Sequence, residues 1–374
     1  MADRGGRIGG ARGGAGRRRT GLPRIAAVRG LAQDGDVGIR EAVRISTLWR
    51  GPFGTFLRYA CSLGLLGWLA GRVDWARLDG LRGLDWSLAA PAAVLAGLAY
   101  PLQAWRWQVL LRTQDIILPV RWVHGVFWIG QFFNSFLPGG VAGDAVRLAH
   151  LWRVAPGRRA GAAASLLADR LLGLGALLAL ATLALGAHGA GAGPGGSLRS
   201  LLGVCAVSCL LVVVGGWSLV RTRWWEPCSA RVLGAERATV LHDAAVALGD
   251  RRLALGGAVA LSLVVWLVDF VSLWLLAKAV GLGAGFLTVT VAAAAAYVAA
   301  SLPVSIGGHG VREVSLVTVL GWLGQGSGGD GGVALLAVAF WALSVAWSLL
   351  GGVVQLASVW LGWPVGRGGP GPVG

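Results

Sequence analysis

The chain has 374 residues, of which 55% are hydrophobic and only 13% charged, and its mean hydropathy is +0.67. A soluble globular protein carries about 25% charged residues, so this composition excludes a soluble domain and predicts an integral membrane protein. The formal net charge of +16 would suit nucleic-acid binding, but nearly half of it falls within residues 1–54, and we expect no nucleic-acid partner.

Residues 1–54 carry a clear excess of arginine over acidic residues and no long apolar run. Basic segments beside membrane spans stay in the cytosol, and this composition is typical of disorder. We therefore predict an Arg-rich, disordered cytosolic tail. No signal peptide is visible, because the first apolar run begins only near Phe56 and has no cleavage site of small residues after it.

About eight apolar segments follow when a span is taken as about 20 residues: residues 56–69, 84–105, 122–137, 160–187, 198–220, 253–277, 286–302 and 333–361. They predict a transmembrane domain over residues 55–363, with a Gly/Pro-rich tail at 364–374. Two of the segments, 122–137 and 286–302, are short and end in Leu-Pro followed by glycines. Such breaks are tolerated in membranes only where they are buried in protein or line a wet cavity.

The charges in the connections indicate how the short segments run. If residues 122–137 crossed the membrane fully, the arginines that follow would lie outside, against the positive-inside rule. If the chain instead enters, turns at residues 138–140 and returns, those arginines stay inside. The same reading of 286–302 places the second break on the opposite side. We therefore predict an all-α polytopic membrane protein with six full spans, two re-entrant broken helices and a cytosolic N-terminus in the cytoplasmic membrane.

The two breaks share a spacing in which a glycine lies five residues and an arginine nine residues after a proline: Pro138, Gly143 and Arg147, then Pro303, Gly308 and Arg312. Because the two dips enter from opposite sides, this predicts an inverted repeat with halves at about 55–190 and 198–361. Paired broken segments of this kind indicate a transporter site near the middle of the membrane. The alternative is that two Leu-Pro kinks share a spacing by coincidence.

A helix that restarts after a glycine-rich break presents free N–H groups and the positive end of its dipole, which favours anions. Arg147 and Arg312 lie in the restarting helices, and arginine matches phosphate oxygens bidentately. These features predict a site for a phosphate-bearing lipid headgroup. The alternative for Arg147 is one more inside-facing positive residue.

Ionisable residues inside apolar segments are functional candidates by default. Asp169 and Arg170 are adjacent, and adjacent residues on a helix point apart, so each requires a partner on another segment. A salt bridge such as Asp169 with Arg147, or Glu313 with Arg170, is an alternative to proton coupling. Asp269 has no charged neighbour in sequence and is the proton-coupling candidate.

Three blocks of sequence together resemble the lysylphosphatidylglycerol synthase transmembrane family, whose members are also described as flippase-like membrane proteins. The blocks are Asn134-x3-Pro138-x4-Gly143-Asp144-x2-Arg147, then Asp169-Arg170-Leu171-Leu172-Gly173-Leu174, then Leu302-Pro303-x-Ser305-x-Gly307-Gly308-x-Gly310-Val311-Arg312-Glu313. They cover residues 122–316 in the order of the family. His309 stands where an apolar or aromatic residue is expected.

The resemblance implies lipid translocation, or association with lipid-linked glycan or aminoacyl-lipid pathways. We expect a flippase for an anionic lipid, either an aminoacyl-phospholipid or a polyprenyl-phosphate-linked sugar. The alternative is a membrane-embedded partner or subunit of a lipid-linked glycosyl- or aminoacyl-transferase. No soluble aminoacyl-transferase domain is visible and no nucleophile elbow, zinc or P-loop motif, so we expect no enzyme, cofactor or metal. A separately encoded transferase is a candidate partner, and a homo-oligomer is left open.

The predicted substrate-binding residues come from both breaks and from the segment between them. They are Asn134, Pro138, Gly139, Gly143, Asp144, Arg147, Asp169, Arg170, Pro303, Gly307, Gly308, His309, Gly310, Arg312 and Glu313.

Overall fold

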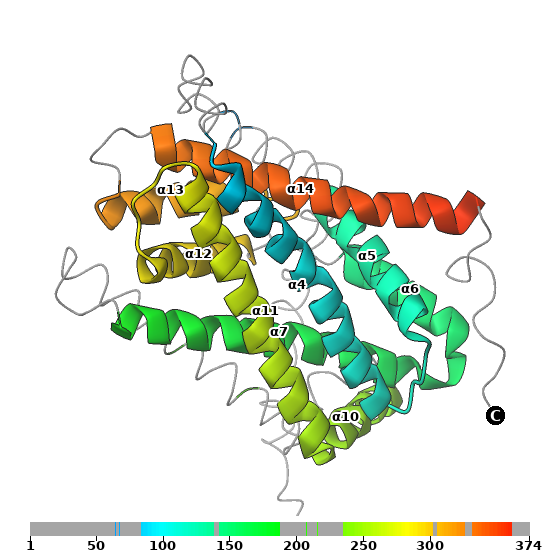
Figure 1. Ribbon diagram of the computed structural model, residues 1–374. Coiled ribbons are helices and arrows are strands. Elements are labelled where there is room, and N and C mark those ends of the chain that lie inside the picture. The colour runs from blue at the N-terminus through cyan, green and yellow to red at the C-terminus, as the bar shows by residue number, and fades with distance from the viewer. Residues whose placement is uncertain are drawn as a thin grey trace, which may run out of the picture. The chain divides into compact units, whose positions relative to one another are not determined.

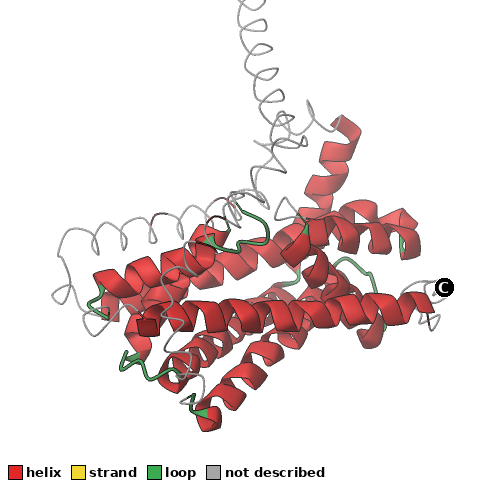
Figure 2. Ribbon diagram, turned by 90° about the horizontal axis from the view of Figure 1, so that it is seen from above, coloured by secondary structure: helices red, strands yellow, loops and turns green. Residues whose placement is uncertain are grey.

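The computed structural model describes residues 84–137, 142–187, 235–301, 305–325 and 331–360, together with the single residues Gly64, Gly67, Val207 and Gly215. Within these residues the chain forms nine α-helices and one short 3-10 helix, and no strand (Figure 1 and Figure 2). The predicted segments at 56–69 and 198–220, and both predicted tails, lie outside the described residues. So do three predicted site residues, Pro138, Gly139 and Pro303.

The helices have the following bounds in chain order. They are α4 (Trp86–Thr113), α5 (Val120–Phe136), α6 (Ala142–Val154), η2 (Pro156–Arg158), α7 (Arg159–Ala187), α10 (Ala235–Asp250), α11 (Arg252–Ala279), α12 (Phe286–Ala300), α13 (Val311–Trp322) and α14 (Gly331–Trp360).

Four of these helices, α4, α7, α11 and α14, are long and apolar enough to cross a membrane. Their outward faces keep large apolar side chains exposed, including Val94, Leu183, Val264 and Val353. On helices of this length and hydropathy, such exposed apolar faces suit contact with lipid. The coarse prediction of a multi-pass helical membrane protein is confirmed.

The predicted end of the second span at Trp105 is wrong. α4 continues to Thr113 and ends where Asp115 takes a positive φ of 52°. Arg106 therefore lies inside the helix and is buried, instead of lying in a cytosolic connection. The positive-inside rule associates arginines with loops, whereas Arg106 remains inside the helix because Asp169 neutralises it at 2.7 Å.

The first break separates α5 and α6, which form an antiparallel hairpin. α5 has 17 residues and is about 25 Å long, which is shorter than the hydrocarbon core of about 30 Å. Asp115, before α5, accepts from Arg158, after α6, at 3.4 Å and from Arg251, before α11, at 2.6 Å. The hairpin therefore begins and ends at the same end of the helix bundle, as a re-entrant segment requires.

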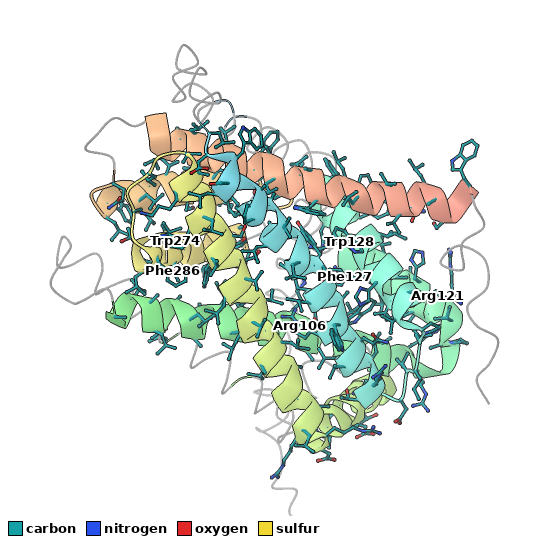
Figure 3. All side chains as sticks on the ribbon, viewed as in Figure 1. Arg106, Arg121, Phe127, Trp128, Trp274 and Phe286 are labelled. Atoms are coloured by element: carbon teal, nitrogen blue, oxygen red, sulfur yellow. The ribbon has the colours of Figure 1, made fainter. Side chains whose placement is uncertain are left out.

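The second break separates α12 and α13, which also pack against each other. α12 has 15 residues, or about 22 Å. Its first residue, Phe286, contacts Trp274 near the end of α11, with ring centroids 5.9 Å apart (Figure 3). In Figure 1 this hairpin lies on one side of the α4 and α11 pair, and the α5–α6 hairpin lies on the other.

The order of a long helix, two short helices and a long helix occurs twice, as α4 to α7 and as α11 to α14. α4 and α11 pack antiparallel: the Asp85 N–H donates to the Ala279 carbonyl at 3.1 Å, and the Ser272 hydroxyl donates to the Ala92 carbonyl at 2.7 Å. In addition, α5 packs on α14 and α12 packs on α7. An inverted repeat would need this arrangement, and the inversion itself stays a prediction.

The two breaks meet inside the bundle. Gly307 has a φ of +59°, and a Cβ added there would lie 2.9 Å from the Asn134 carbonyl oxygen, so glycine is required by both backbone conformation and space. One turn of α14 holds both hairpins, because Ser348 hydrogen-bonds the Ser135 hydroxyl at 2.7 Å and Ser344 accepts from Arg312 at 2.8 Å.

The path of the first hairpin makes a prediction about membrane sidedness. In a variant without the four native cysteines, single cysteines at Gly157 and Ala247 are expected to react with an impermeant maleimide from the cytosolic side. A cysteine at Gly324, after the second hairpin, is expected to react from the opposite side. The three positions are exposed, and the measurement is labelling of intact and permeabilised cells. Labelling of Gly157 together with Gly324 would contradict the re-entrant arrangement.

Candidate functional site

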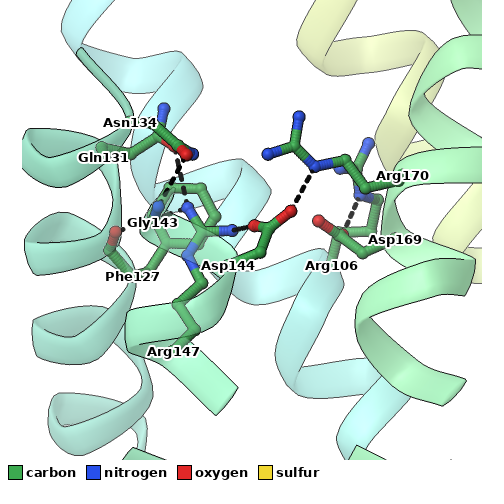
Figure 4. Close-up of polar contacts among 9 residues, drawn as sticks. All are labelled: Arg106, Phe127, Gln131, Asn134, Gly143, Asp144, Arg147, Asp169 and Arg170. Carbon is green, nitrogen blue, oxygen red and sulfur yellow. Dashed lines mark hydrogen bonds and ion pairs between the residues drawn. The ribbon is translucent and has the colours of Figure 1, made fainter. Parts of the chain in front are cut away.

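Polar side chains join the end of α5 to the start of α6 at the first break (Figure 4). Asn134 Oδ1 accepts from the Gly143 N–H at 2.8 Å, and Gln131 Oε1 accepts from Arg147 Nη2 at 2.8 Å. A Cβ added at Gly143 would collide with the carbonyl oxygen of Gly130. Glycine at position 143 therefore allows the two backbones to approach closely enough for these hydrogen bonds.

Arg147 is buried between the two helices of the first hairpin, with 3% of its surface exposed. Its guanidinium carbon lies 4.0 Å from the centre of the Phe127 ring, a cation–π contact, and Nη1 lies 3.5 Å from Asp144. Its Nε has no hydrogen-bond partner among the described residues. Arg147 is therefore mostly committed to protein groups and does not extend into open space.

Asp169 and Arg170 point to partners on different elements, as predicted for adjacent residues of a helix. Asp169 accepts from Arg106 of α4 at 2.7 Å, and Arg170 donates to Asp144 of α6 at 2.7 Å. The salt bridge suggested between Asp169 and Arg147 is wrong, because Arg106 takes that place. The one suggested between Glu313 and Arg170 is also wrong, because Arg170 pairs with Asp144.

Arg106 is a residue of the site that the sequence reasoning missed. It also donates to the Ser262 hydroxyl of α11 at 3.0 Å, so it joins three long helices. Gly173 leaves room for it, since a Cβ there would lie 3.2 Å from Arg106 Nη1. The apolar pattern continues beyond Arg106 to Leu110 and Leu111, and this continuation was the signal available in the sequence.

These side chains form one row of alternating charge that crosses α6, α7 and α4 (Figure 4). We call it the charge row, and its members are Arg147, Asp144, Arg170, Asp169 and Arg106. The side chain of Arg170 is 50% exposed, whereas the Arg106 side chain is 6% exposed. Arg170 is therefore the most exposed of the three cations in the charge row.

The second break holds a compact ion pair at the start of α13. Glu313 is fully buried, and its two oxygens accept from the Gly310 N–H at 2.7 Å and from Arg312 Nη2 at 2.6 Å. Arg312 also lies over the Phe340 ring of α14, 4.1 Å from its centre. Gly308 packs on Ala300, where a Cβ would lie 2.7 Å from the Ala300 side chain.

At the start of each helix predicted to bind an anion, a backbone N–H group already donates a hydrogen bond to a side chain of the protein. Gly143 donates to Asn134, and Gly310 donates to Glu313. In this conformation the caps of α6 and α13 are internal, so a ligand anion would have to displace them or bind beside them.

Asp269 lies inside the long helix α11. It makes no hydrogen bond or ion pair with any described residue. The Arg312 guanidinium is the cation that interacts with it electrostatically. The phenol groups of Tyr100 and Tyr297 also interact electrostatically with this carboxylate. No group of three or more His, Cys, Asp or Glu side chains is placed to hold a metal in the described part of the chain.

The chain matches a known protein family over most of its length. The family model for the lysylphosphatidylglycerol synthase transmembrane region matches residues 55–351. No curated protein and no solved structure matches the chain. The family match spans both hairpins, the charge row and most of the length of the four long helices. The chain therefore belongs to the lysylphosphatidylglycerol synthase transmembrane-region family.

Proposed function

We propose that this protein moves an anionic lipid across the cytoplasmic membrane, carrying its phosphate headgroup past the point where the two hairpins meet. The substrate class is an aminoacyl-phospholipid or a polyprenyl-phosphate-linked sugar. The observation that carries this proposal is the contact between the two breaks, at Gly307 and Asn134, with charged side chains on both sides of it.

The arrangement of helices supports transport. Broken helices that meet near the middle of a membrane, from halves of opposite direction, are the usual site of secondary transporters. The antiparallel packing of α4 on α11 and the two helical hairpins are what such halves require. We place the end that carries Asp115 in the cytosol, because exposed arginines gather there: Arg112, Arg121, Arg153, Arg158, Arg159, Arg251 and Arg252.

Arg170 makes the first contact with the headgroup in this proposal. Asp144 lies 2.7 Å from Arg170 Nε and 3.5 Å from Arg147, so a phosphate that approaches Arg170 competes with a carboxylate already there. Displacement of Asp144 would loosen the link between the first hairpin and α7. Lipid binding would thereby be coupled to movement of that hairpin. Asp269 is proposed to take up a proton during the cycle.

Replacement of Arg170 tests the proposal. In liposomes, the wild-type protein is expected to move a fluorescent monoanionic phospholipid faster than a neutral lipid. Arg170→Gln is expected to slow this movement about tenfold or more, because a hydrogen bond between charged groups contributes about 1.5–3 kcal/mol. Arg170→Lys is expected to keep part of the rate. Dithionite added outside the liposomes destroys the fluorescence of labelled lipid in the outer leaflet only. The measurement is the rate at which the remaining fluorescence is lost as labelled lipid arrives from the inner leaflet.

Arg112→Gln is the matched control, because Arg112 is an exposed arginine at the end of α4, away from the charge row. It should move the lipid at the wild-type rate. If Arg170→Gln moves anionic lipid as fast as Arg112→Gln, the role of Arg170 is wrong. If the wild-type protein moves no lipid but forms an aminoacyl or glycosyl product with a transferase, the transferase-partner alternative replaces transport.

A further inference from the structure

The second break is an unusually curled segment. Gly307, Gly308 and Gly310 all have positive φ, at 59°, 78° and 84°, a conformation that side chains with a Cβ rarely adopt. The segment turns back on itself and presses against the end of α5 at Ser135. The His309 ring lies beside the Ser135 backbone, where the two hairpins meet, and Ser305 lies four residues earlier in the same segment.

Two side chains of this segment, Ser305 and the partly buried His309, carry buried polar atoms without a hydrogen-bond partner among the described residues. Ser305 is 3% exposed and its hydroxyl makes no hydrogen bond, and neither ring nitrogen of His309 makes one of normal geometry, although the ring lies beside the Ser135 backbone. Buried polar groups in proteins are nearly always paired. In contrast, Asn134 and Gln131 at the first break both accept hydrogen bonds.

The chemistry of these groups differs from that of the charge row. A serine hydroxyl and a neutral imidazole each donate one hydrogen bond and accept another. Arg312 and Glu313 beside them neutralise each other at 2.6 Å, so the described part of the segment presents no free ionic partner for a phosphate. Groups that both donate and accept match ligand hydroxyls, which also do both.

We propose that Ser305 and His309 form a hydroxyl-binding site, which recognises the hydroxyl groups of a lipid headgroup whose phosphate is held at the charge row. This inference rests on the proposed function and deepens it, because it selects a polyhydroxylated headgroup such as a glycerol or a sugar. The groups are enclosed in this conformation, so the headgroup reaches them when the second hairpin moves away from Ser135.

Two lipids with the same phosphodiester charge test the site. Short-chain phosphatidylglycerol carries two headgroup hydroxyls and phosphatidylmethanol carries none. Binding is measured as the rise in melting temperature of the purified protein with lipid concentration, since a ligand that binds the native state stabilises it. The wild-type protein is expected to bind phosphatidylglycerol about tenfold more tightly, corresponding to one or two hydrogen bonds.

His309→Phe and Ser305→Ala are each expected to reduce this preference severalfold by weakening phosphatidylglycerol binding, with little change for phosphatidylmethanol. His309→Gln should keep part of the preference, because an amide also donates and accepts. Ser301→Ala is the matched control, since the Ser301 hydroxyl is exposed and already donates to the Val298 carbonyl at 2.6 Å. It should keep the wild-type preference.

Equal binding of the two lipids by the wild-type protein overturns the inference. So does a preference that persists in both His309→Phe and Ser305→Ala, the second of which removes a single oxygen and should not impair folding. The proposed transport is judged separately, by movement of lipid in liposomes. A hydroxyl preference that these variants abolish supports the site even if the wild-type protein moves no lipid.

Discussion

Arg106→Leu is expected to destabilise the protein by about 3–5 kcal/mol, because it leaves the Asp169 carboxylate buried without a partner. The side chains of Arg106 and Asp169 are both 6% exposed and are joined at 2.7 Å. The same change also removes the hydrogen bond to Ser262 that connects α4 to α11. The measurement is the free energy of unfolding in mixed micelles, followed by circular dichroism during denaturant titration.

Two companion variants separate the ion pair from simple loss of packing. Arg106→Leu with Asp169→Leu removes both charges, and we expect most of the stability to return, because a buried pair replaced by apolar groups is often neutral. Arg158→Leu removes a half-exposed partner of Asp115, and a pair of this kind contributes at most about 1 kcal/mol. A double variant as unstable as Arg106→Leu would show that the charge of Asp169 is not the cause.

The long helices could be predicted from hydropathy alone, because lipid requires about 20 apolar residues in each span. The predicted and observed bounds of α12 agree at its start, Phe286, and α7 ends at Ala187 as predicted. The return of the first hairpin to the end at which it began could be predicted from charge, since the positive-inside rule keeps the arginines on both sides of it at one membrane face. The span-length rule and the positive-inside rule depend on the membrane around a segment, so they can be applied without knowing which other helices it contacts.

The pairing of charges could not be predicted in the same way. Arg106 and Asp169 are 63 residues apart, and no local spacing connects them. The rule that neighbours on a helix point apart held for Asp169 and Arg170 within α7. It does not describe Arg312 and Glu313, which are adjacent at the start of α13 and pair with each other at 2.6 Å.

The sequence indicates only one of the two side chains that cap the starts of α6 and α13. Glu313 lies three residues after Gly310, the spacing of a capping box, and it does accept from the Gly310 N–H. This spacing could have shown that the helix start is already occupied by a carboxylate. Asn134 caps Gly143 from across the break, and that contact depends on the hairpin fold.

The two hairpins differ in where their ion pairs are formed. The first is tied to α7 through the ion pair of Asp144 with Arg170, which lies beside the pair of Asp169 with Arg106. In the second, Arg312 and Glu313 neutralise each other within the hairpin, and Arg312 is linked to α14 by a neutral hydrogen-bond partner, Ser344. The second hairpin therefore has its own charges paired, and its Arg312 interacts electrostatically with the carboxylate of Asp269 on α11.

This difference makes a prediction for two acids that carry the same charge. Asp269→Asn is expected to leave the stability within about 1 kcal/mol of wild type or to raise it, because an intramembrane carboxylate without a partner is costly. Glu313→Gln is expected to cost about 3 kcal/mol or more, because it leaves Arg312 buried without its counter-ion. The measurement is the free energy of unfolding of both variants in the same micelles.

The same pair tests proton coupling. The groups that interact electrostatically with Asp269 are Tyr100 from α4, Tyr297 from α12 and Arg312 from α13, and Arg312 is paired with Glu313. Asp269 is the acid among them without an ion pair to a described residue, so it is the one expected to take up a proton as the second hairpin moves. A pH gradient across liposomes is expected to accelerate lipid movement by the wild-type protein and to have no effect on Asp269→Asn. Equal acceleration of both proteins would show that the coupling group lies elsewhere.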